Sequence, residues 1–153
     1  MAFIPLYDLD PLDRNSTPVV TYGLIAANVL LYVLSLAMPE DSERAFTLAV
    51  GLIPAVVMGE ASVPDGLPPI LTFVTHTFVH GNWMHLLGNM LFLWVLGDNV
   101  EDAFGHRNFL IFYLLCGVAG GVAYLLSDPY SAVVLIGASG SIAGVIAAYV
   151  MMR

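Results

Sequence analysis

The run VVTYGLIAANVLLYVLSLAM, from Val19 to Met38, decides the class of fold. It holds no charged side chain, and a helix needs about 20 mainly apolar residues to cross the hydrocarbon core of a bilayer. Pro39 follows at once and cannot continue the helix. The preceding Ser16-Thr17-Pro18 offers hydroxyl N-caps and then a proline at the first helical position. We therefore expect a first membrane-spanning helix over about residues 18–38.

Three more apolar stretches follow, over about residues 83–103, 108–126 and 137–152. The second and third are separated by Gly105-His106-Arg107-Asn108, and the third is closed by Ser127-Asp128-Pro129. Glycine, asparagine and proline at such positions indicate loops. The sequence thus predicts an all-α membrane protein, a polytopic bundle with four transmembrane helices that forms one domain over residues 1–153.

The connection over residues 39–82 differs from the four spans. Four prolines interrupt it, at Pro54, Pro64, Pro68 and Pro69, and proline breaks a helix interior. Its apolar pieces, residues 45–57 and 67–79, are too short to span and are typical of interfacial or re-entrant helices. We expect a lobe of short helices between the first and second spans.

Composition agrees with lipid as the main solvent. The 153 residues are 59% hydrophobic and 10% charged, with a mean hydropathy of +0.85, whereas soluble domains are roughly 25% charged. The net charge of −8 includes only four basic residues, which excludes a basic footprint for nucleic acid. Cys116 is the only cysteine, so the chain forms no internal disulfide.

The arginines indicate the orientation, because cytoplasmic loops carry an excess of basic residues. A cytoplasmic N-terminus puts Arg14, Arg107 and Arg153 inside and leaves Arg44 outside. The 39–82 connection then faces the exterior, as do the starts of the second and fourth spans. We expect a multi-pass protein of a bacterial inner membrane, in contact with lipid and with other transmembrane helices.

His85 and Asn89 are four residues apart in the second span, so both lie on one helix face. Polar side chains at membrane depth usually face a protein interior or a water-filled cavity. An imidazole and an amide can stabilise an oxyanion, and they can equally hydrogen-bond a neighbouring helix. The pair alone leaves both interpretations open.

The fourth span opens with Gly137-Ala138-Ser139-Gly140-Ser141. A serine at a helix start lies beside backbone N–H groups that have no helical partner, and the flanking glycines allow close approach of a substrate. The same residues fit a packing pattern, because Gly140 and Gly144 have the spacing of small residues in packed membrane helices. A serine nucleophile and a packing patch are both consistent with this segment.

Read together, three segments resemble the rhomboid family of intramembrane serine proteases. They are THTFVHGNWMHLLGN over residues 75–89, GDNVEDAFG over 97–105, and GASG over 137–140. The shared features are three histidines in register, a His-x-x-x-Asn pair, an acidic turn, and Gly-x-Ser-Gly at the start of the fourth helix. The resemblance extends from about residue 17 to the last residue.

The resemblance implies a role for each matched residue. Ser139 matches the nucleophile, His85 and Asn89 match the side chains that form the oxyanion site with the Ser139 amide, and Gly137 matches the first glycine of the nucleophile motif. It implies that the 39–82 connection is a partly embedded lobe. The matched structural residues near the site are Glu101, which pins the turn after helix two, His80 and His76, which link to the lobe, and Gly140 with Gly144.

The sequence departs from the family in one respect. A serine needs a base to act as a nucleophile, and in rhomboids this base is a histidine on a sixth helix. The histidines of this sequence are His76, His80, His85 and His106, and His106 is expected on the opposite membrane face. We therefore expect a truncated rhomboid that has little protease activity alone, and we expect another segment or chain to cover Gly140 and Gly144.

Two functions remain open. One is a rhomboid protease that cleaves substrate membrane helices near the external face, with its base on helices outside this sequence. The other is a catalytically dead rhomboid that binds membrane helices as an accessory subunit of a larger complex. Neither requires a cofactor, and we expect no metal site, because the clustered histidines have no acid beside them.

Overall fold

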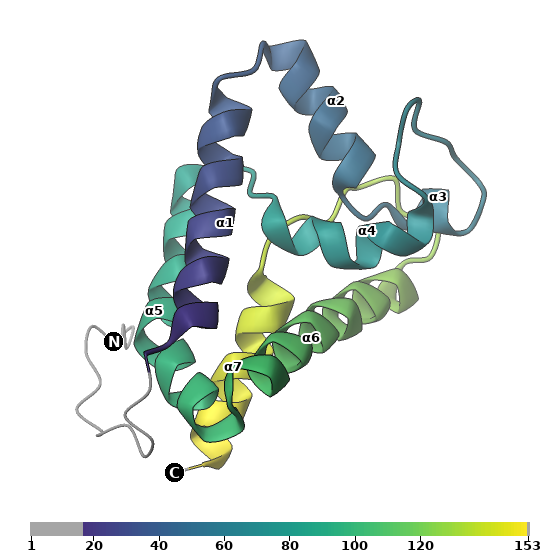
Figure 1. Ribbon diagram of the computed structural model, residues 1–153. Helices are drawn as coiled ribbons and strands as arrows, with labels where there is room; N and C mark the ends of the chain where they lie inside the picture. Colours follow the sequence, from purple (N-terminus) through teal and green to yellow (C-terminus); the bar gives the residue numbers. More distant parts are fainter. Residues whose placement is uncertain (1–16, 153) are drawn as a thin grey trace, which may run out of the picture.

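The computed structural model describes residues 17–152 and is helical over most of them (Figure 1). Ser16, Arg14 and Arg153, which the predicted first cap and orientation use, lie outside the described residues. Within this part of the chain, the single pairing of β type is an isolated antiparallel bridge between Leu52 and Leu135. The elements in order are α1 (Val19–Leu36), α2 (Glu40–Val50), α3 (Pro54–Val57), α4 (Pro69–Thr75), the short 3₁₀ helix η1 (His76–Phe78), α5 (Trp83–Phe104), α6 (His106–Ser127) and α7 (Ser139–Met151).

The all-helical architecture is confirmed, and α1, α5, α6 and α7 lie where the four apolar stretches predict helices. Of these, α1 and α6 are long and apolar enough to cross a membrane. The last two turns of α5 carry Asp98, Glu101 and Asp102, which lowers their hydropathy. With 13 residues, α7 is only about 20 Å long, against a hydrocarbon core of about 30 Å.

The fourth helix begins at Ser139, within the stretch from Gly137 to Ser141 where the sequence places its start. Gly137 has a φ of +114°, a conformation outside the right-handed helical region. The chain therefore bends at residue 137. It turns into the helix only at Ser139, which becomes the first helical residue.

Glycines bring α6 and α7 into close contact. A Cβ on Gly140 would lie 3.3 Å from the Cα of Gly120, and one on Gly144 would lie 2.3 Å from the Sγ of Cys116. The prediction that another segment or chain covers these two glycines is therefore wrong. Small residues let two backbones approach closely, and α6 of the same chain occupies that space.

The side chain of Glu101 holds α1 against α5. Its carboxylate accepts hydrogen bonds from the amides of Val20 and Thr21, at 2.9 and 2.7 Å. Pro18 is the N-cap of α1 rather than the first helical residue that the sequence predicted, and it makes no side-chain cap hydrogen bond, so Glu101 supplies the acceptor. The predicted acidic turn is helical up to Phe104. Because Gly97 has no side chain, α1 can approach α5 closely at this position, where a Cβ would lie 3.1 Å from the Thr21 Oγ1.

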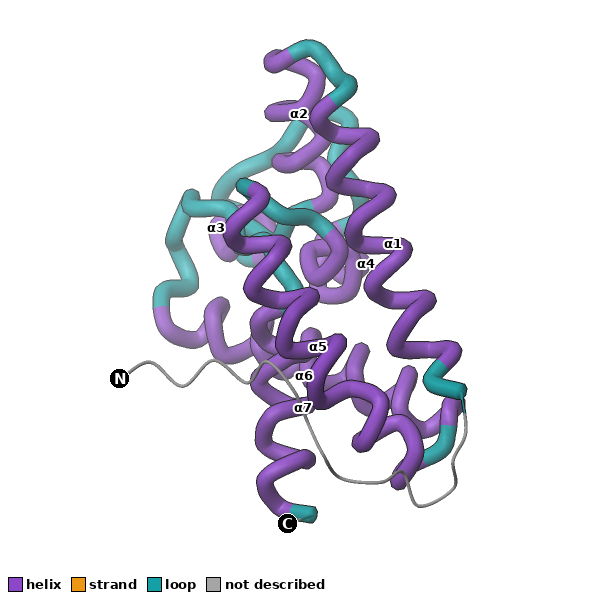
Figure 2. Tube along the Cα trace, turned by 90° about the vertical axis from the view of Figure 1, so that its left-hand side faces the viewer, coloured by secondary structure: helices purple, strands orange, loops and turns teal. Residues whose placement is uncertain are grey.

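The 39–82 connection contains the short helices α2, α3, α4 and η1, which together are called the lobe here. Figure 2 shows α2 beside one end of α1, at the end of the molecule remote from the C-terminus. The lobe is bonded to the loop that leads to α7, because Leu52 and Leu135 exchange two backbone hydrogen bonds, of 3.1 and 2.8 Å. The amide of Ala55 also donates to the carbonyl of Ser131 at 3.0 Å. The lobe thus fixes the path of the chain just before Ser139.

Candidate active site

Ser139 is the first residue of α7 and is exposed. The first amides of a helix have no partner within it, and the helix dipole concentrates positive charge at this end. The side chain of Ser139 and its own N–H therefore lie together at a place that favours negative charge. In Figure 1, α7 starts at a level between the two ends of α5, and both helices reach the same end of the molecule.

The ring of His85 packs directly on Gly137, two residues before Ser139. A Cβ on Gly137 would lie 2.5 Å from the Cε1 and 2.6 Å from the Nε2 of His85. Two conditions therefore require glycine here, namely this contact and the positive φ. The structure brings His85 of α5 against the serine motif of α7.

Asn89 lies one turn along α5 from His85 and is 8% exposed. Its Nδ2 is 3.0 Å from the Nε2 of His80. When the amide donates this bond, the proton of the neutral imidazole is on Nδ1. The orientation of the Asn89 side chain is therefore fixed by a histidine of the loop that precedes α5.

His80 also contacts His85, with the ring centroids 5.1 Å apart and the rings edge to face. Burial, and then the neighbouring His85, lower the pKa of His80 to about 4. His80 is therefore neutral at neutral pH and can accept a hydrogen bond from Asn89. The three side chains form a connected row, in the order His85, His80, Asn89.

His76 takes part through its backbone. Its carbonyl accepts a hydrogen bond from the amide of Gly137 at 2.8 Å, and its side chain is buried in η1. This bond ties the serine motif to the lobe at a point between the Leu52–Leu135 bridge and Ser139. The sequence pattern singled out His76 as a member of a histidine series, but nothing in a sequence reveals a role for a carbonyl.

Glu101 and His106 lie together at the other end of α5. The carboxylate of Glu101 is fully buried and binds the Nδ1 of His106 as well as the Oγ1 of Thr21. His85 and Glu101 are 16 residues apart on one helix, which is about 24 Å along its axis. Glu101 and His106 are therefore remote from Ser139.

Sequence reasoning missed Asn82, which positions the start of α5. Its Oδ1 accepts a hydrogen bond from the amide of His85 at 2.9 Å, so it is the N-cap of the helix that carries His85 and Asn89. The signal was present, because asparagine is among the preferred N-cap residues and precedes the apolar run directly.

The long apolar helices and this arrangement of polar groups define a class. It is that of helical membrane proteins with a polar site set among their helices. Within this class, a serine at a helix start beside an imidazole and an amide is typical of few families.

Comparison with known proteins identifies the family. The Rhomboid domain matches residues 69–153, which is more than half of the chain. The chain belongs to the rhomboid family. No solved structure matches.

Several curated rhomboid proteins are similar to the chain. Rhomboid-like protein 11, chloroplastic, of Arabidopsis thaliana is 38% identical over 56% of this chain and 30% of its own length. Rhomboid protease GluP of Bacillus subtilis (strain 168) is 30% identical over 88% of this chain and 25% of its own length. Rhomboid-like protease 3 of Toxoplasma gondii is 25% identical over 80% and 44%, respectively. The chain thus spans less than half of the length of these relatives.

Proposed function

We propose that this chain carries the nucleophile and oxyanion residues of a rhomboid-type intramembrane serine protease. In this proposal Ser139 is the nucleophile, and His85, Asn89 and the amide of Ser139 stabilise the oxyanion. The observation that carries it is the contact of the His85 ring with Gly137, two residues before an exposed serine at a helix start. The similarity to proteins named rhomboid proteases supports it.

The proposed reaction is hydrolysis of a peptide bond in a substrate membrane helix. The hydroxyl of Ser139 attacks the carbonyl carbon and loses its proton to a base, while the carbonyl oxygen gains negative charge. Donors that are already oriented toward this oxygen stabilise the transition state, since they need no reorganisation during the reaction. His80 contributes indirectly, because its bond to Nδ2 holds the Asn89 side chain in one orientation.

The base is proposed to be a histidine that lies outside residues 17–152. His85 is assigned to the oxyanion site, His80 binds Asn89, and His106 binds Glu101 at the far end of α5. The ring of His76 is buried in η1. The exposed face of α7, with Ser139, Ala143 and Ala147 in line at four-residue spacing, is the surface where a helix bearing this histidine would pack.

The proposed setting is a bilayer that α1, α5, α6 and α7 all cross, with the lobe partly embedded on the external side. Because α7 is the shortest of the four, Ser139 would lie below the outer surface, at the depth of a substrate helix. We place the chain in a bacterial inner membrane with its N-terminus in the cytoplasm. The arginine distribution supports this orientation.

Chemical rescue tests the proposed roles. The purified chain is treated with a fluorophosphonate probe, which labels activated serines, with and without added imidazole as a substitute base. We expect imidazole-dependent labelling that Ser139→Ala abolishes and that the control Ser127→Ala, in the exposed last turn of α6, does not change. His85→Ala and Asn89→Ala should each slow the labelling, up to about 100-fold for an oxyanion donor. Labelling that persists in Ser139→Ala would contradict the assignment.

A second function is favoured by the position of the histidines. Because none of the four is assigned as a base for Ser139, the chain would also suit a role as a catalytically dead rhomboid that binds membrane helices in a larger complex. The gene beyond the Arg153 codon separates the two proposals. Two further apolar spans with a histidine would favour the protease, whereas a stop codon would favour the accessory subunit.

A further inference from the structure

Three polar side chains that the proposed protease site does not use meet in the interior of the helix bundle. They are Asn28 of α1, Tyr113 of α6 and Ser141 of α7, and each is 0% exposed. The Tyr113 hydroxyl lies within reach of the side chains of both Asn28 and Ser141. Its ring belongs to the hydrophobic core that also contains Phe109 and Val145. One polar group from each of three helices therefore converges on one place among apolar side chains.

Each of the three side chains has a buried oxygen without a direct hydrogen bond. Within residues 17–152, the Oδ1 of Asn28, the hydroxyl of Tyr113 and the Oγ of Ser141 make none. The Nδ2 of Asn28 is already engaged, since it donates to the carbonyl of Leu24 at 2.8 Å. Buried polar groups are rarely left unbonded, and leaving them so is especially costly in a membrane protein. The cluster therefore offers one acceptor and two hydroxyls to a common partner.

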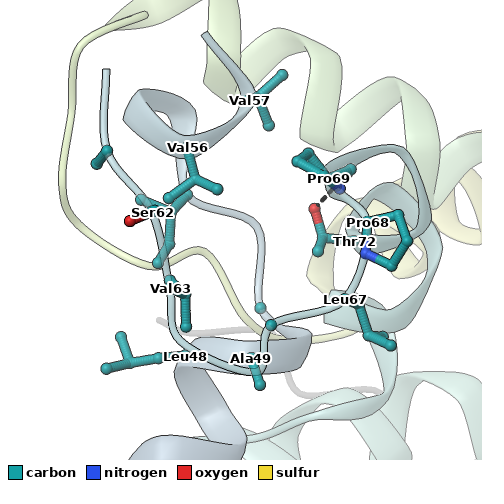
Figure 3. Close-up of a pocket in the computed structure, with 14 residues that line it drawn as sticks. Leu48, Ala49, Val56, Val57, Ser62, Val63, Leu67, Pro68, Pro69 and Thr72 are labelled. Carbon is teal, nitrogen blue, oxygen red and sulfur yellow. Dashed lines mark hydrogen bonds between the residues drawn. The ribbon is translucent and has the colours of Figure 1, made fainter. Parts of the chain in front are cut away.

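The hydroxyl of Ser141 is oriented differently from other buried hydroxyls of the chain. Several of those donate to the carbonyl three residues earlier, at 2.9, 2.7 and 2.7 Å for Ser35, Thr72 and Thr77, respectively. Figure 3 shows this bond from Thr72 to Pro69. The Ser141 Oγ instead lies against α6, 2.7 Å from where a Cβ on Gly117 would be. Gly117 is one turn after Tyr113, so the missing side chain there leaves room for Ser141 to turn toward the cluster.

A water molecule matches the chemistry of this cluster. Water can donate two hydrogen bonds and accept two, and a buried water typically bonds about three protein groups that otherwise have no partner. The Oδ1 of Asn28 can only accept, whereas the hydroxyls of Tyr113 and Ser141 can both donate and accept. A metal ion or an anion is a poor match, because none of the three side chains carries a charge to offset its desolvation.

We propose that Asn28, Tyr113 and Ser141 bind one buried water molecule that joins α1, α6 and α7. The water donates to the Oδ1 of Asn28 and to the Oγ of Ser141, and it accepts a hydrogen bond from the Tyr113 hydroxyl. Because α7 begins at Ser139, this site holds the first turn of α7 to the other two helices. The inference does not depend on protease activity.

Radiolytic oxidation tests the site. The chain in lipid nanodiscs receives a brief X-ray pulse, which produces hydroxyl radicals from bound as well as bulk water, and mass spectrometry measures the oxidation rate of each residue. Phe109 is the internal control, because it lies one turn before Tyr113 on α6 and is also 0% exposed. We expect Tyr113 to be oxidised about tenfold faster than Phe109, because only Tyr113 would contact a buried water. A ratio no larger than that of the two free amino acids would overturn the proposal.

Variants test whether these side chains hold the water. Asn28→Leu and Ser141→Ala each remove one partner of the water, and each should slow the oxidation of Tyr113 by about fivefold, the effect of one lost hydrogen bond. The matched control is Ser35→Ala, since Ser35 is buried on α1 and its hydroxyl already bonds a carbonyl. This control should leave the Tyr113 rate unchanged.

Slow oxidation of Phe109 shows that a variant has kept its fold. Ser141→Ala is the milder change, and it decides alone if Asn28→Leu exposes Phe109. Fast oxidation of Tyr113 that persists in the folded variants would overturn the proposal, because the water would then be held by other groups.

Discussion

At the scale of single residues, Gly137 is the position that tolerates least change. Its φ of +114° and the His85 ring 2.5 Å from a would-be Cβ both oppose a side chain. We expect Gly137→Ala to lower the free energy of unfolding by about 2–5 kcal/mol, the sum of a strained backbone of roughly 1–2 kcal/mol and an overpacked contact of roughly 1–3 kcal/mol. Equilibrium unfolding in mixed micelles measures this loss.

Gly88→Ala is the matched control for this prediction. Gly88 is also on the helix that carries His85, but a Cβ there meets no atom within 4 Å, so alanine should be neutral or stabilising by about 0.5–1 kcal/mol. Equal losses in the two variants would contradict the proposed reason for glycine at position 137.

His80 makes stability depend on pH. Its pKa in the folded chain is about 4, below the ordinary 6.5. Between these values the unfolded chain binds a proton at His80 that the folded chain does not, so stability falls as the pH is lowered from 6.5 to 4. Over the full interval the loss is about 3 kcal/mol, and His80 adds no further loss below pH 4.

Comparison with His80→Gln isolates this effect, because glutamine does not titrate. All other titratable groups are the same in both proteins, so only the difference between the two stability curves reports on His80. We expect the variant to lose about 3 kcal/mol less than the wild type between pH 6.5 and 4. Parallel curves would show that His80 is not held neutral by the fold.

At the scale of helices, Glu101 joins three elements. It accepts hydrogen bonds from the first turn of α1 and from the Thr21 side chain, and it binds His106 at the start of α6. In Glu101→Gln an amide NH₂ group replaces one carboxylate oxygen, so a donor faces the N–H and O–H donors that this oxygen accepted from. We expect a loss of about 1–3 kcal/mol, the cost of buried groups left without a partner, together with faster hydrogen exchange at Val20 and Thr21.

The control is Glu60→Gln, which removes the same charge from an exposed loop position. Exposed charges of this kind contribute little to stability, so this variant should be within about 0.5 kcal/mol of the wild type. If Glu101→Gln behaved like this control, the carboxylate would not be what holds α1 to α5.

The bounds of α5 and α6 were predictable to within about two residues, because apolar runs and the glycine or proline that ends them are local features. The start of α7 agrees with its prediction equally well, but the conformation of Gly137 was not predictable, since it depends on His85 and on the His76 carbonyl, more than 50 residues earlier in the chain. The glycine spacing on α7 was recognised, but its partner was assigned wrongly. A pattern of small residues indicates close packing without indicating against which helix.

At the scale of the whole molecule, the residues of the site come from three parts of the chain that meet at one place. The pattern of histidines, asparagine and serine in the sequence named most of them, because their chemistry belongs to side chains. The same pattern could not show that the lobe holds the loop over residues 131–137 by backbone hydrogen bonds, from Leu52 to Leu135 and from Ala55 to Ser131. The lobe therefore does more than connect two helices, since it fixes the approach to Ser139.

The same arrangement makes the orientation in the membrane testable. The lobe and the α5–α6 turn lie at opposite ends of the molecule (Figure 1), so a bilayer crossed by the long helices should separate them. Arg107 at the α5–α6 turn predicts a cytoplasmic position for that end. In a Cys116→Ala background, Glu60→Cys reports on the lobe and Asn108→Cys on the turn, and both positions are exposed. In bacterial spheroplasts that express the chain, a membrane-impermeant maleimide should label Glu60→Cys at once and Asn108→Cys only after lysis. The reverse pattern would invert the orientation, and equal labelling of both before lysis would show that no bilayer separates the two ends.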